Sequence, residues 1–188
     1  MNFNFELSQI IELEEVSSTQ DLAKELAKKA SLTDNTAICA QTQTAGRGRF
    51  EHTWQSNKGG LYISLLLKPV KTTSTIGDLS IKTGQAAAMA LEEMFNLKTT
   101  IKLPNDVLVQ TKQGNKKICG VLIESAVSSQ QVEWLIVGVG VNLNNKTDKN
   151  LNAANVKELI KQDVDIKAFR ETFLKHFATK YIEWQLSK

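Results

Sequence analysis

The sequence has few of the residues that build metal centres, disulfide frameworks or membrane spans. It contains two cysteines, two histidines and two prolines in 188 residues. Cys39 and Cys119 each lie in an apolar stretch, so we expect two buried free thiols in a reducing compartment. So few histidines and cysteines predict no metal site formed by these residues. The sequence lacks a basic, apolar signal segment at its start and a bilayer-length apolar run, so we expect a cytoplasmic protein without a membrane partner.

Composition and charge favour one globular domain. Hydrophobic residues make up 41% of the chain and charged residues 23%, which suits a single domain over residues 1–188 with a substantial core. The net charge is only +3, whereas general nucleic-acid binders are usually more basic. Any positive charge used in function must therefore be local.

The hydrophobic pattern predicts strands in the middle of the chain and helices before and after them. Strands are expected over residues 36–41, 61–67, 99–103, 107–111, 117–124 and 132–141. The last of these is nearly all apolar and is predicted to be central, and the two before it are predicted to pair through a turn at 113–115. Helices are expected over 80–95 and in the chain after 141, where the aromatic residues mostly recur every three or four positions. This order predicts an α+β fold.

The first helix is expected to start within Ser17-Ser18-Thr19-Gln20-Asp21. Hydroxyl groups at this position can accept backbone N–H bonds, and Asp21 follows three residues later. Leu22, Leu26 and Ala30 recur at four-residue spacing, so we expect this helix to bury them.

The segment from residue 42 to residue 60 is the least ordinary part of the sequence. Gly46-Arg47-Gly48-Arg49 combines flexible backbone with two forked donors for phosphate or carboxylate, and Trp54 can stack on a flat ring. These features are typical of a lid over an anionic ligand. A solvated basic loop and an RNA-binding arginine-glycine segment remain alternatives, because short motifs carry little weight alone.

Two further segments contain polar residues or glycines at strand ends or within strands. Pro104 places Asn105 and Asp106 in a turn after a strand, although these are ordinary turn residues. Asn142 follows an apolar strand interrupted by glycines, and its amide could contact an adenine edge. The alternative for the glycines is a packing requirement where strands crowd.

A lysine begins the strand predicted over residues 117–124. Strand periodicity puts Lys117 on the same face as Cys119, Val121 and Ile123. If that face lines a site, Lys117 brings a charge to it and Gly120 allows close ligand approach. A lysine at a hairpin end is the ordinary alternative.

Taken in order, these segments resemble the catalytic domain of the biotin protein ligases. The matching motifs are Ser18-Thr19-Gln20, the loop from Gln43 to Trp54, Lys102 to Asp106, Lys117 to Leu122, and Gly138 to Asn142. The resemblance runs from about residue 10 to about residue 145. Five motifs in the right order make coincidence a poor explanation. The family fold is a mixed β-sheet with helices packed on it, related to class II aminoacyl-tRNA synthetases.

The resemblance implies an enzyme that joins biotin and ATP into biotinyl-5′-AMP and then transfers biotin to a lysine of a biotin carboxyl carrier protein, a subunit of acetyl-CoA carboxylase. It implies Mg²⁺ with the nucleotide. The implied catalytic residues are Lys117, Arg47 and Arg49. The implied biotin-binding residues are Ser18, Thr19, Gln20, Gln43, Gly46, Arg47, Gly48, Arg49, Lys117, Gly120 and Leu122. The implied nucleotide-binding residues are Arg47, Arg49, Trp54, Asn105, Lys117 and Asn142.

The sequence departs from the family pattern in several places. Gln20 replaces an asparagine, Leu103 replaces a tryptophan and is expected to be a packing substitution, and Phe50-Glu51-His52 stands where the family often has Arg-Gly-Arg. The last change predicts a lid that is stiffer or holds the adenylate less well. The motifs start too early for an N-terminal helix-turn-helix domain, so we expect no DNA partner. We likewise expect no small C-terminal β-barrel domain after the last predicted helix. A lipoate or octanoate ligase, and a biotin- or RNA-binding module without turnover, are the alternatives.

Overall fold

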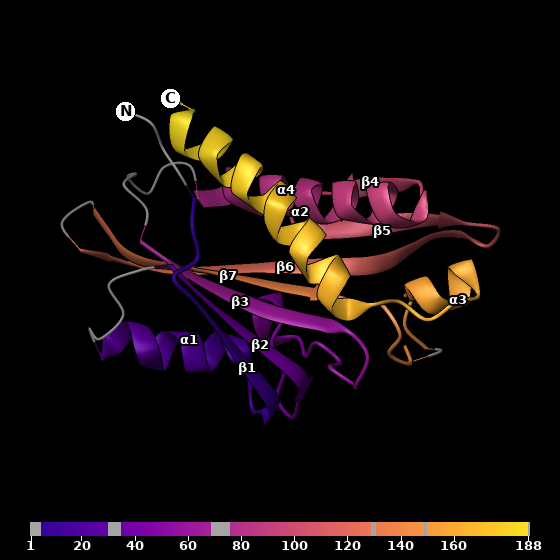
Figure 1. The fold of residues 1–188 in the computed structure, drawn as a ribbon, viewed down its shortest axis with the longest axis horizontal. Helices are drawn as coiled ribbons and strands as arrows, with labels where there is room; N and C mark the ends of the chain where they lie inside the picture. Colours follow the sequence, from indigo (N-terminus) through magenta and orange to yellow (C-terminus); the bar gives the residue numbers. More distant parts are fainter. Residues whose placement is uncertain (1–4, 30–34, 69–75, 129–130, 149, 188) are drawn as a thin grey trace.

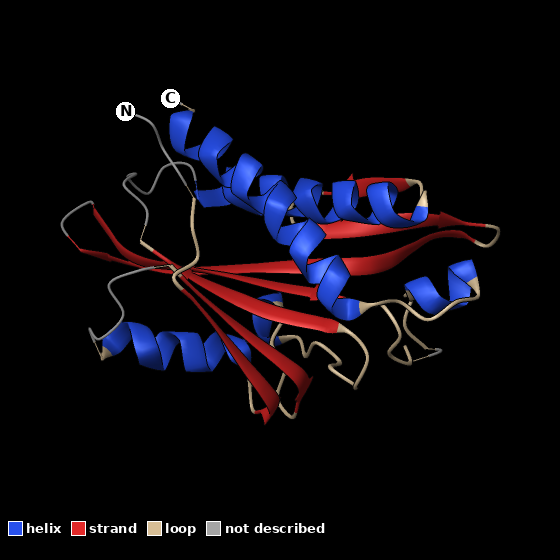
Figure 2. Ribbon diagram, viewed as in Figure 1, coloured by secondary structure: helices blue, strands red, loops and turns tan. Residues whose placement is uncertain are grey.

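The fold is a mixed seven-stranded β-sheet with helices on both faces (Figures 1 and 2). The computed structural model describes residues 5–29, 35–68, 76–128, 131–148 and 150–187. The elements are β1 (Gln9–Val16), α1 (Thr19–Lys28), β2 (Thr36–Gln43), a 3₁₀ turn (Arg49–Glu51), β3 (Leu61–Leu67), α2 (Ile76–Phe95), β4 (Thr99–Lys102), β5 (Asp106–Thr111), β6 (Gly114–Ser128), β7 (Gln131–Val141), α3 (Val156–Ile160) and α4 (Ile166–Leu186). The α+β prediction is therefore confirmed.

The strands follow the order β1-β2-β3-β7-β6-β5-β4 across the sheet. β1 and β2 run parallel, and the other neighbouring pairs run antiparallel. β7 lies in the middle between β3 and β6, as its apolar composition predicted. β1 was not predicted: it is an edge strand in which no residue is fully buried, and glutamates interrupt its apolar residues.

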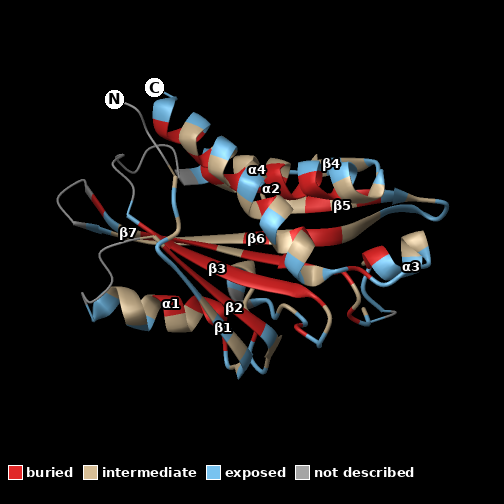
Figure 3. Cartoon of the chain, in the orientation of Figure 1, coloured by how far each residue is buried: buried red, intermediate tan, exposed pale blue. Residues whose placement is uncertain are grey.

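Helices α2 and α4 form one layer against the sheet, and α1 covers the other face (Figure 1). The largest apolar cluster lies between the sheet, α2 and α4, and Figure 3 shows the buried sides of these helices. α4 contributes the predicted aromatic face, on which Phe169, Phe173, Phe177, Tyr181 and Trp184 are all buried. Within the described residues, no helix combines the length and apolar character needed to cross a membrane.

Helix α1 begins as predicted but buries different residues. The Ser18 side chain accepts a hydrogen bond from the Asp21 backbone N–H at 3.3 Å, which is the expected cap. Thr19, Gln20 and Ala23 are the buried residues of this helix, rather than the leucines expected from spacing. Leu22 and Leu26 are only partly buried against the smaller core cluster, and Ala30 lies outside the described residues. The expected stripe was wrong because the first turn of α1 contacts the sheet through polar groups.

The hairpin of β5 and β6 is longer than predicted and contains an irregularity. The two strands turn at residues 112–113, one residue earlier than expected, and β6 continues to Ser128. Their register shifts between Val107, which pairs with Cys119, and Leu108, which pairs with Lys117. Ile118 is thus the extra residue of a β-bulge.

Candidate active site

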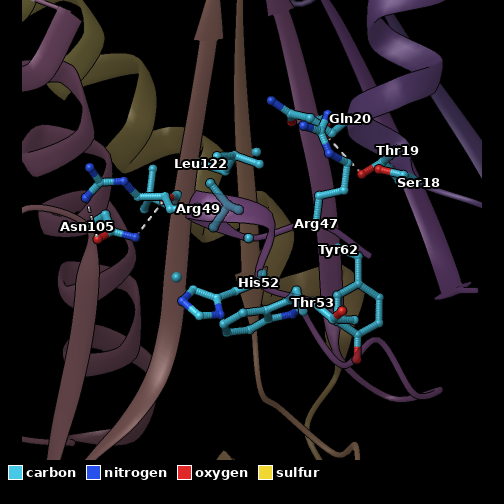
Figure 4. A pocket seen from close by; sticks show the side chains of 18 of the residues that line it. Ser18, Thr19, Gln20, Arg47, Arg49, His52, Thr53, Tyr62, Asn105 and Leu122 are labelled. Atoms are coloured by element: carbon cyan, nitrogen blue, oxygen red, sulfur yellow. Dashed lines mark hydrogen bonds between the residues drawn. The ribbon is translucent and has the colours of Figure 1, made fainter. Parts of the chain in front are cut away.

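A pocket lies between the start of α1, the loop after β2 and the face of the sheet opposite α2 and α4 (Figure 4). Its volume is about 290 Å³. Most of the residues predicted for the site line it together: Ser18, Thr19, Gln20, Gln43, Arg47, Gly48, Arg49, Trp54, Asn105, Lys117, Gly120 and Leu122. Gly138 and Gly140 line it as well, so the fold brings residues from all five sequence motifs to one place.

A network of buried polar side chains forms one end of the pocket. Gln43 Oε1 accepts hydrogen bonds from Thr19 N at 2.8 Å and Thr19 Oγ1 at 3.1 Å, and Gln43 Nε2 donates to Ser56 Oγ at 2.7 Å. The Thr19 and Ser64 hydroxyls lie 2.9 Å apart, and Ser64 Oγ donates to Gln20 Oε1 at 3.0 Å. Such a network orients each hydroxyl and amide before a polar ligand arrives.

Ser64 is a pocket residue that sequence reasoning missed. It is 1% exposed and lies in β3, where every residue is buried. A serine within the otherwise aliphatic and aromatic strand Leu61–Leu67 was the available signal, because buried polar side chains require hydrogen-bond partners.

Trp54 covers one glycine of β6 and one glycine of β7. A Cβ atom on Gly140 would lie 2.4 Å from indole atoms of Trp54, and one on Gly120 would lie 2.8 Å from the same ring. The sequence suggested that Gly120 allows close ligand approach, and Gly120 does line the pocket; it and Gly140 also make room for the indole. The Trp54 Nε1 atom is buried and has no hydrogen-bond partner in the described structure.

Lys117 lines the pocket because of the β-bulge. Strand alternation predicted that it shares a face with Cys119 and Val121, and this was wrong: those two side chains are in the main core, whereas Lys117 lies with Gly120 in the pocket. The extra residue at Ile118 reverses the alternation.

Several groups hold Lys117 in this position. The Lys117 Nζ atom lies 2.7 Å from Asp106 Oδ1 and 5.2 Å from the ring centroid of Trp54. Its backbone N–H donates to Asn152 O, and its carbonyl accepts from Ala154 N, both at 2.9 Å. Asp106 was predicted only as a turn residue, and the structure makes it the ionic partner of Lys117.

The two loop arginines lie on opposite sides of the pocket (Figure 4). Arg49 Nη1 donates to Asn105 Oδ1 at 3.2 Å, and the Arg49 guanidinium carbon lies 4.8 Å from the ring centroid of Phe50. Asn105 is itself held by Val121, because each donates one hydrogen bond to the other's backbone carbonyl. Among the described residues, the partners of Arg49 are thus uncharged.

Arg47 instead contacts two carboxylates. Its Nη1 atom donates to Asp21 Oδ1 at 2.7 Å and Glu124 Oε2 at 3.2 Å, and Nη2 donates to Glu124 Oε1 at 3.1 Å. Lys24 Nζ also donates to Glu124 Oε1, at 2.6 Å. Burial alone would raise the pKa of Glu124, but hydrogen bonds from Lys24 and Gln20 and the nearby positive charges hold this pKa below its ordinary value.

A second cavity of about 350 Å³ adjoins the pocket on the other side of Trp54 and Lys117. Both residues line both cavities, and so do Thr53 and Asp106. Asn142, the remaining predicted adenine contact, lines only this second cavity. The Asn142 Oδ1 atom accepts from Asn145 Nδ2 at 3.0 Å, which leaves its amide nitrogen as the donor for a ligand.

Two predicted positions lie elsewhere. Gly46 lines neither cavity: a Cβ there would lie 2.4 Å from Trp54 O and 2.5 Å from Ser56 Oγ, so this glycine lets the loop fold on itself. Leu103 was expected to be a packing substitution, but it is 68% exposed.

Phe50 is 81% exposed and has a left-handed backbone with φ of 53°.

The part of the chain that contains these site residues is similar to a known protein family. The model of the Biotin/lipoate A/B protein ligase family matches residues 12–142, which is more than half of the chain. The chain belongs to the biotin/lipoate A/B protein ligase family.

Two relatives with similar sequences carry ligase names. A bifunctional ligase/repressor BirA from Bacillus spizizenii is 35% identical over 134 residues, which are 71% of this chain and 40% of that protein. A biotin–[acetyl-CoA-carboxylase] ligase from Paracoccus denitrificans is 30% identical, over 87% of this chain and 68% of that protein. The chain thus spans about 40% of the length of the Bacillus relative.

The fold also matches that of a solved biotin ligase. The biotin protein ligase from Aquifex aeolicus, in complex with biotin and ATP, superposes with a TM-score of 0.79 at 34% identity. The match covers 95% of this chain and 72% of that one. The predicted family and fold are therefore confirmed.

Proposed function

We propose that this protein is an ATP-dependent biotin protein ligase. It would form biotinyl-5′-AMP and then transfer biotin to a lysine of a biotin carboxyl carrier protein, a subunit of acetyl-CoA carboxylase. The observation that carries this proposal is the pair of adjoining cavities that share Lys117 and Trp54. Two substrates in neighbouring sites would meet at a lysine.

The first cavity suits biotin. Its polar end, formed by Ser18, Thr19 and Gln43, offers donors and acceptors for a ureido ring, and its apolar wall at Leu122 suits an aliphatic tail. Gln20 contributes a further amide to this end. The tail would then direct its carboxylate toward Lys117.

The second cavity suits the adenine nucleotide. Trp54 provides a flat ring for the base, and Asn142 presents an amide donor at the cavity wall. Asn105 and Arg49 lie on the first-cavity side of this boundary, where an α-phosphate would meet the biotin carboxylate. Gly48 and Gly120 belong to the surface that encloses the reacting groups.

The reaction needs positive charge rather than a general base. A biotin carboxylate is already ionised at neutral pH, so one of its oxygens can attack the α-phosphorus directly while the bond to pyrophosphate breaks. Lys117 and Arg49 would offset the repulsion between the anions and stabilise the added charge on phosphoryl oxygens. Mg²⁺ would accompany the triphosphate. The described residues contain no group of three or more His, Cys, Asp or Glu side chains placed to hold a metal.

The second step transfers the biotinyl group. The neutral amine of the acceptor lysine attacks the acyl carbon of the mixed anhydride, an amide bond forms, and AMP leaves. Water would destroy the same anhydride, so the loop from Gly46 to Trp54 must exclude it between the two steps. We place this reaction in the cytoplasm, and the proposal includes neither DNA nor a membrane as a partner.

The family also includes lipoate ligases, and this is the nearest alternative. The biotin-ligase names of the relatives and the polar end of the first cavity favour biotin. A dithiolane ring offers no counterpart for a network of hydroxyl and amide groups, whereas a ureido ring does. A biotin- or RNA-binding module without turnover is the alternative of another class.

The deciding experiment is exchange of labelled pyrophosphate into ATP in the presence of biotin, with lipoate as the control. Exchange that depends on biotin supports the proposal, and exchange only with lipoate would reassign the substrate. Biotin binding without exchange would identify a binding module. RNA binding that weakens steeply with salt and ignores biotin would favour the RNA-binding alternative.

A further inference from the structure

The surroundings of Arg47 differ from those expected of a residue that binds an anionic substrate. We propose that Asp21 and Glu124 form a carboxylate clasp, which holds Arg47 and thereby keeps the loop over residues 46–54 closed on the first cavity. The clasp would make both carboxylates positioning residues that control retention of the adenylate. This consequence for the adenylate rests on the proposed function, whereas the effect on the loop does not.

The clasp joins three separate elements. Asp21 lies in the first turn of α1, Glu124 lies in β6, and Arg47 comes from the loop between β2 and β3. Arg47 donates three hydrogen bonds through both terminal nitrogens of its guanidinium, and two of them form a fork onto the Glu124 carboxylate. Forked, charge-assisted bonds fix orientation as well as distance.

Holding Arg47 holds the rest of the loop. Arg47 pairs with Thr53 in an antiparallel bridge, and Gly48 N donates to His52 O, so the loop folds back on itself as a small hairpin. Trp54 N donates to Gly46 O at the base of this hairpin. A fixed guanidinium at position 47 therefore restrains the backbone up to Trp54, which covers the site.

Charge within this cluster is balanced. Arg47 and Lys24 supply two positive charges, and Asp21 and Glu124 supply two negative charges. The four side chains are 22–45% exposed, so this network lies at the edge of the site rather than in the core. A neutralised Arg47 attracts a substrate carboxylate less strongly than Arg49 does, because the described partners of Arg49, Asn105 and Phe50, carry no charge.

The alternative is that Arg47 binds the substrate anion, and it predicts the opposite effect of a carboxylate substitution on retention of the adenylate. If Arg47 binds the substrate anion, then Asp21 and Glu124 compete with that anion for the same guanidinium. Removing a competing carboxylate would strengthen retention of the adenylate, whereas removing part of a clasp would weaken it. The Glu124→Gln change therefore separates the two explanations, because it removes a charge while keeping the shape of the side chain.

The first test measures the loop without any ligand. Hydrogen–deuterium exchange of amides in residues 46–54 should become about threefold to tenfold faster in Glu124→Gln and in Asp21→Asn. Glu183→Gln is the matched control, because Glu183 bridges Lys82 and Lys180 on the far helices α2 and α4. That control should leave exchange in the loop unchanged. Unchanged exchange in both clasp variants would overturn the clasp.

The second test measures how long the adenylate stays bound. Release of labelled biotinyl-5′-AMP should be about threefold to tenfold faster in Glu124→Gln than in the unchanged protein. Arg47→Lys should release it faster as well, because the amine keeps the charge but loses the fork. Slower release from Glu124→Gln would overturn the clasp and favour competition. If no adenylate forms at all, the proposed function fails, and the ligand-free exchange experiment still decides the clasp.

Discussion

The two faces of strands β6 and β7 are built from alternating residues of the same segments, and they differ in kind. The face toward α2 and α4 contributes Cys119, Val121, Val137, Val139 and Val141 to the main core. The opposite face contributes Gly120, Leu122, Gly138 and Gly140 to the pocket. One face is filled with side chains that stabilise the fold, whereas the other lacks them at the positions where Trp54 and Gln20 lie.

Residues that stabilise the fold and residues that line the pocket therefore alternate along the same two strands. Changes on the helix-side face should alter the free energy of unfolding and spare the reaction in the folded protein. Changes on the pocket face should alter substrate handling with little effect on unfolding. The β-bulge matters because it moves Lys117 from the first face to the second.

The largest effect is expected for Lys117→Ala on the pocket face. Biotin-dependent pyrophosphate exchange should fall by about 10³-fold, because the cation shared by both cavities is lost. The melting temperature should change little. Lys116→Ala is the matched control: this neighbour contacts Gln113 and lines neither cavity, so exchange should stay normal. Normal exchange in Lys117→Ala would contradict its assignment to the site.

The helix-side counterpart is Phe173→Ala. Phe173 is fully buried in α4, and truncating it should lower the free energy of unfolding by about 3–5 kcal/mol in urea titrations. At low temperature the folded fraction should bind biotin with unchanged affinity, measured by calorimetry. A large loss of affinity with little loss of stability would break the separation of the two faces.

A smaller effect is expected for Gly140→Ala. The new methyl group would lie 2.4 Å from the Trp54 indole, so the ring must move away from its place between the cavities. The KM for ATP should rise by about tenfold, while biotin affinity changes less. Gly77→Ala is the control, because among the described residues no atom outside the neighbouring backbone of α2 lies within 4 Å of the added Cβ. An unchanged KM for ATP would show that the indole position does not govern nucleotide binding.

The smallest effect concerns the thiols of the helix-side core at high pH. Burial raises the pKa of Cys119 from 9.0 to about 12, and burial outweighs the lowering by Arg170 to raise that of Cys39 to about 11. As the pH rises, the thiols ionise in the unfolded chain before they do so in the folded protein. The thiols therefore do not lower the free energy of unfolding well below pH 9, and this free energy falls as the pH rises from 9 toward the pKa values of the folded protein. Between pH 8 and pH 10, the free energy of unfolding measured in urea should fall by about 1 kcal/mol less in Cys119→Ala than in the unchanged protein. Equal losses would show that Cys119 ionises equally readily in both states.

Much of the pocket could be predicted from the sequence, because its residues occur in short motifs whose order resembles one family. The motif residues Thr19, Gln43 and Lys117 do line the pocket. Ser64 was missed because it lies outside any motif, although a hydroxyl in an apolar strand signalled it. Leu103 was misplaced because sequence does not show whether a substituted aromatic position is exposed.

The sequence by itself determined the mixed α+β architecture, the central position of β7, the cap of α1 and the family. These follow from hydrophobic period, capping chemistry and motif order, which are local properties of the chain. Only the tertiary structure decided that Lys117 faces the pocket and that Arg47 and Arg49 point to different partners. The reason is physical: a one-residue bulge reverses strand alternation, and the partners of Arg47 are 26 and 77 residues away in the sequence. The Gly-Arg-Gly-Arg motif shows two similar cations, and the fold gives them different surroundings.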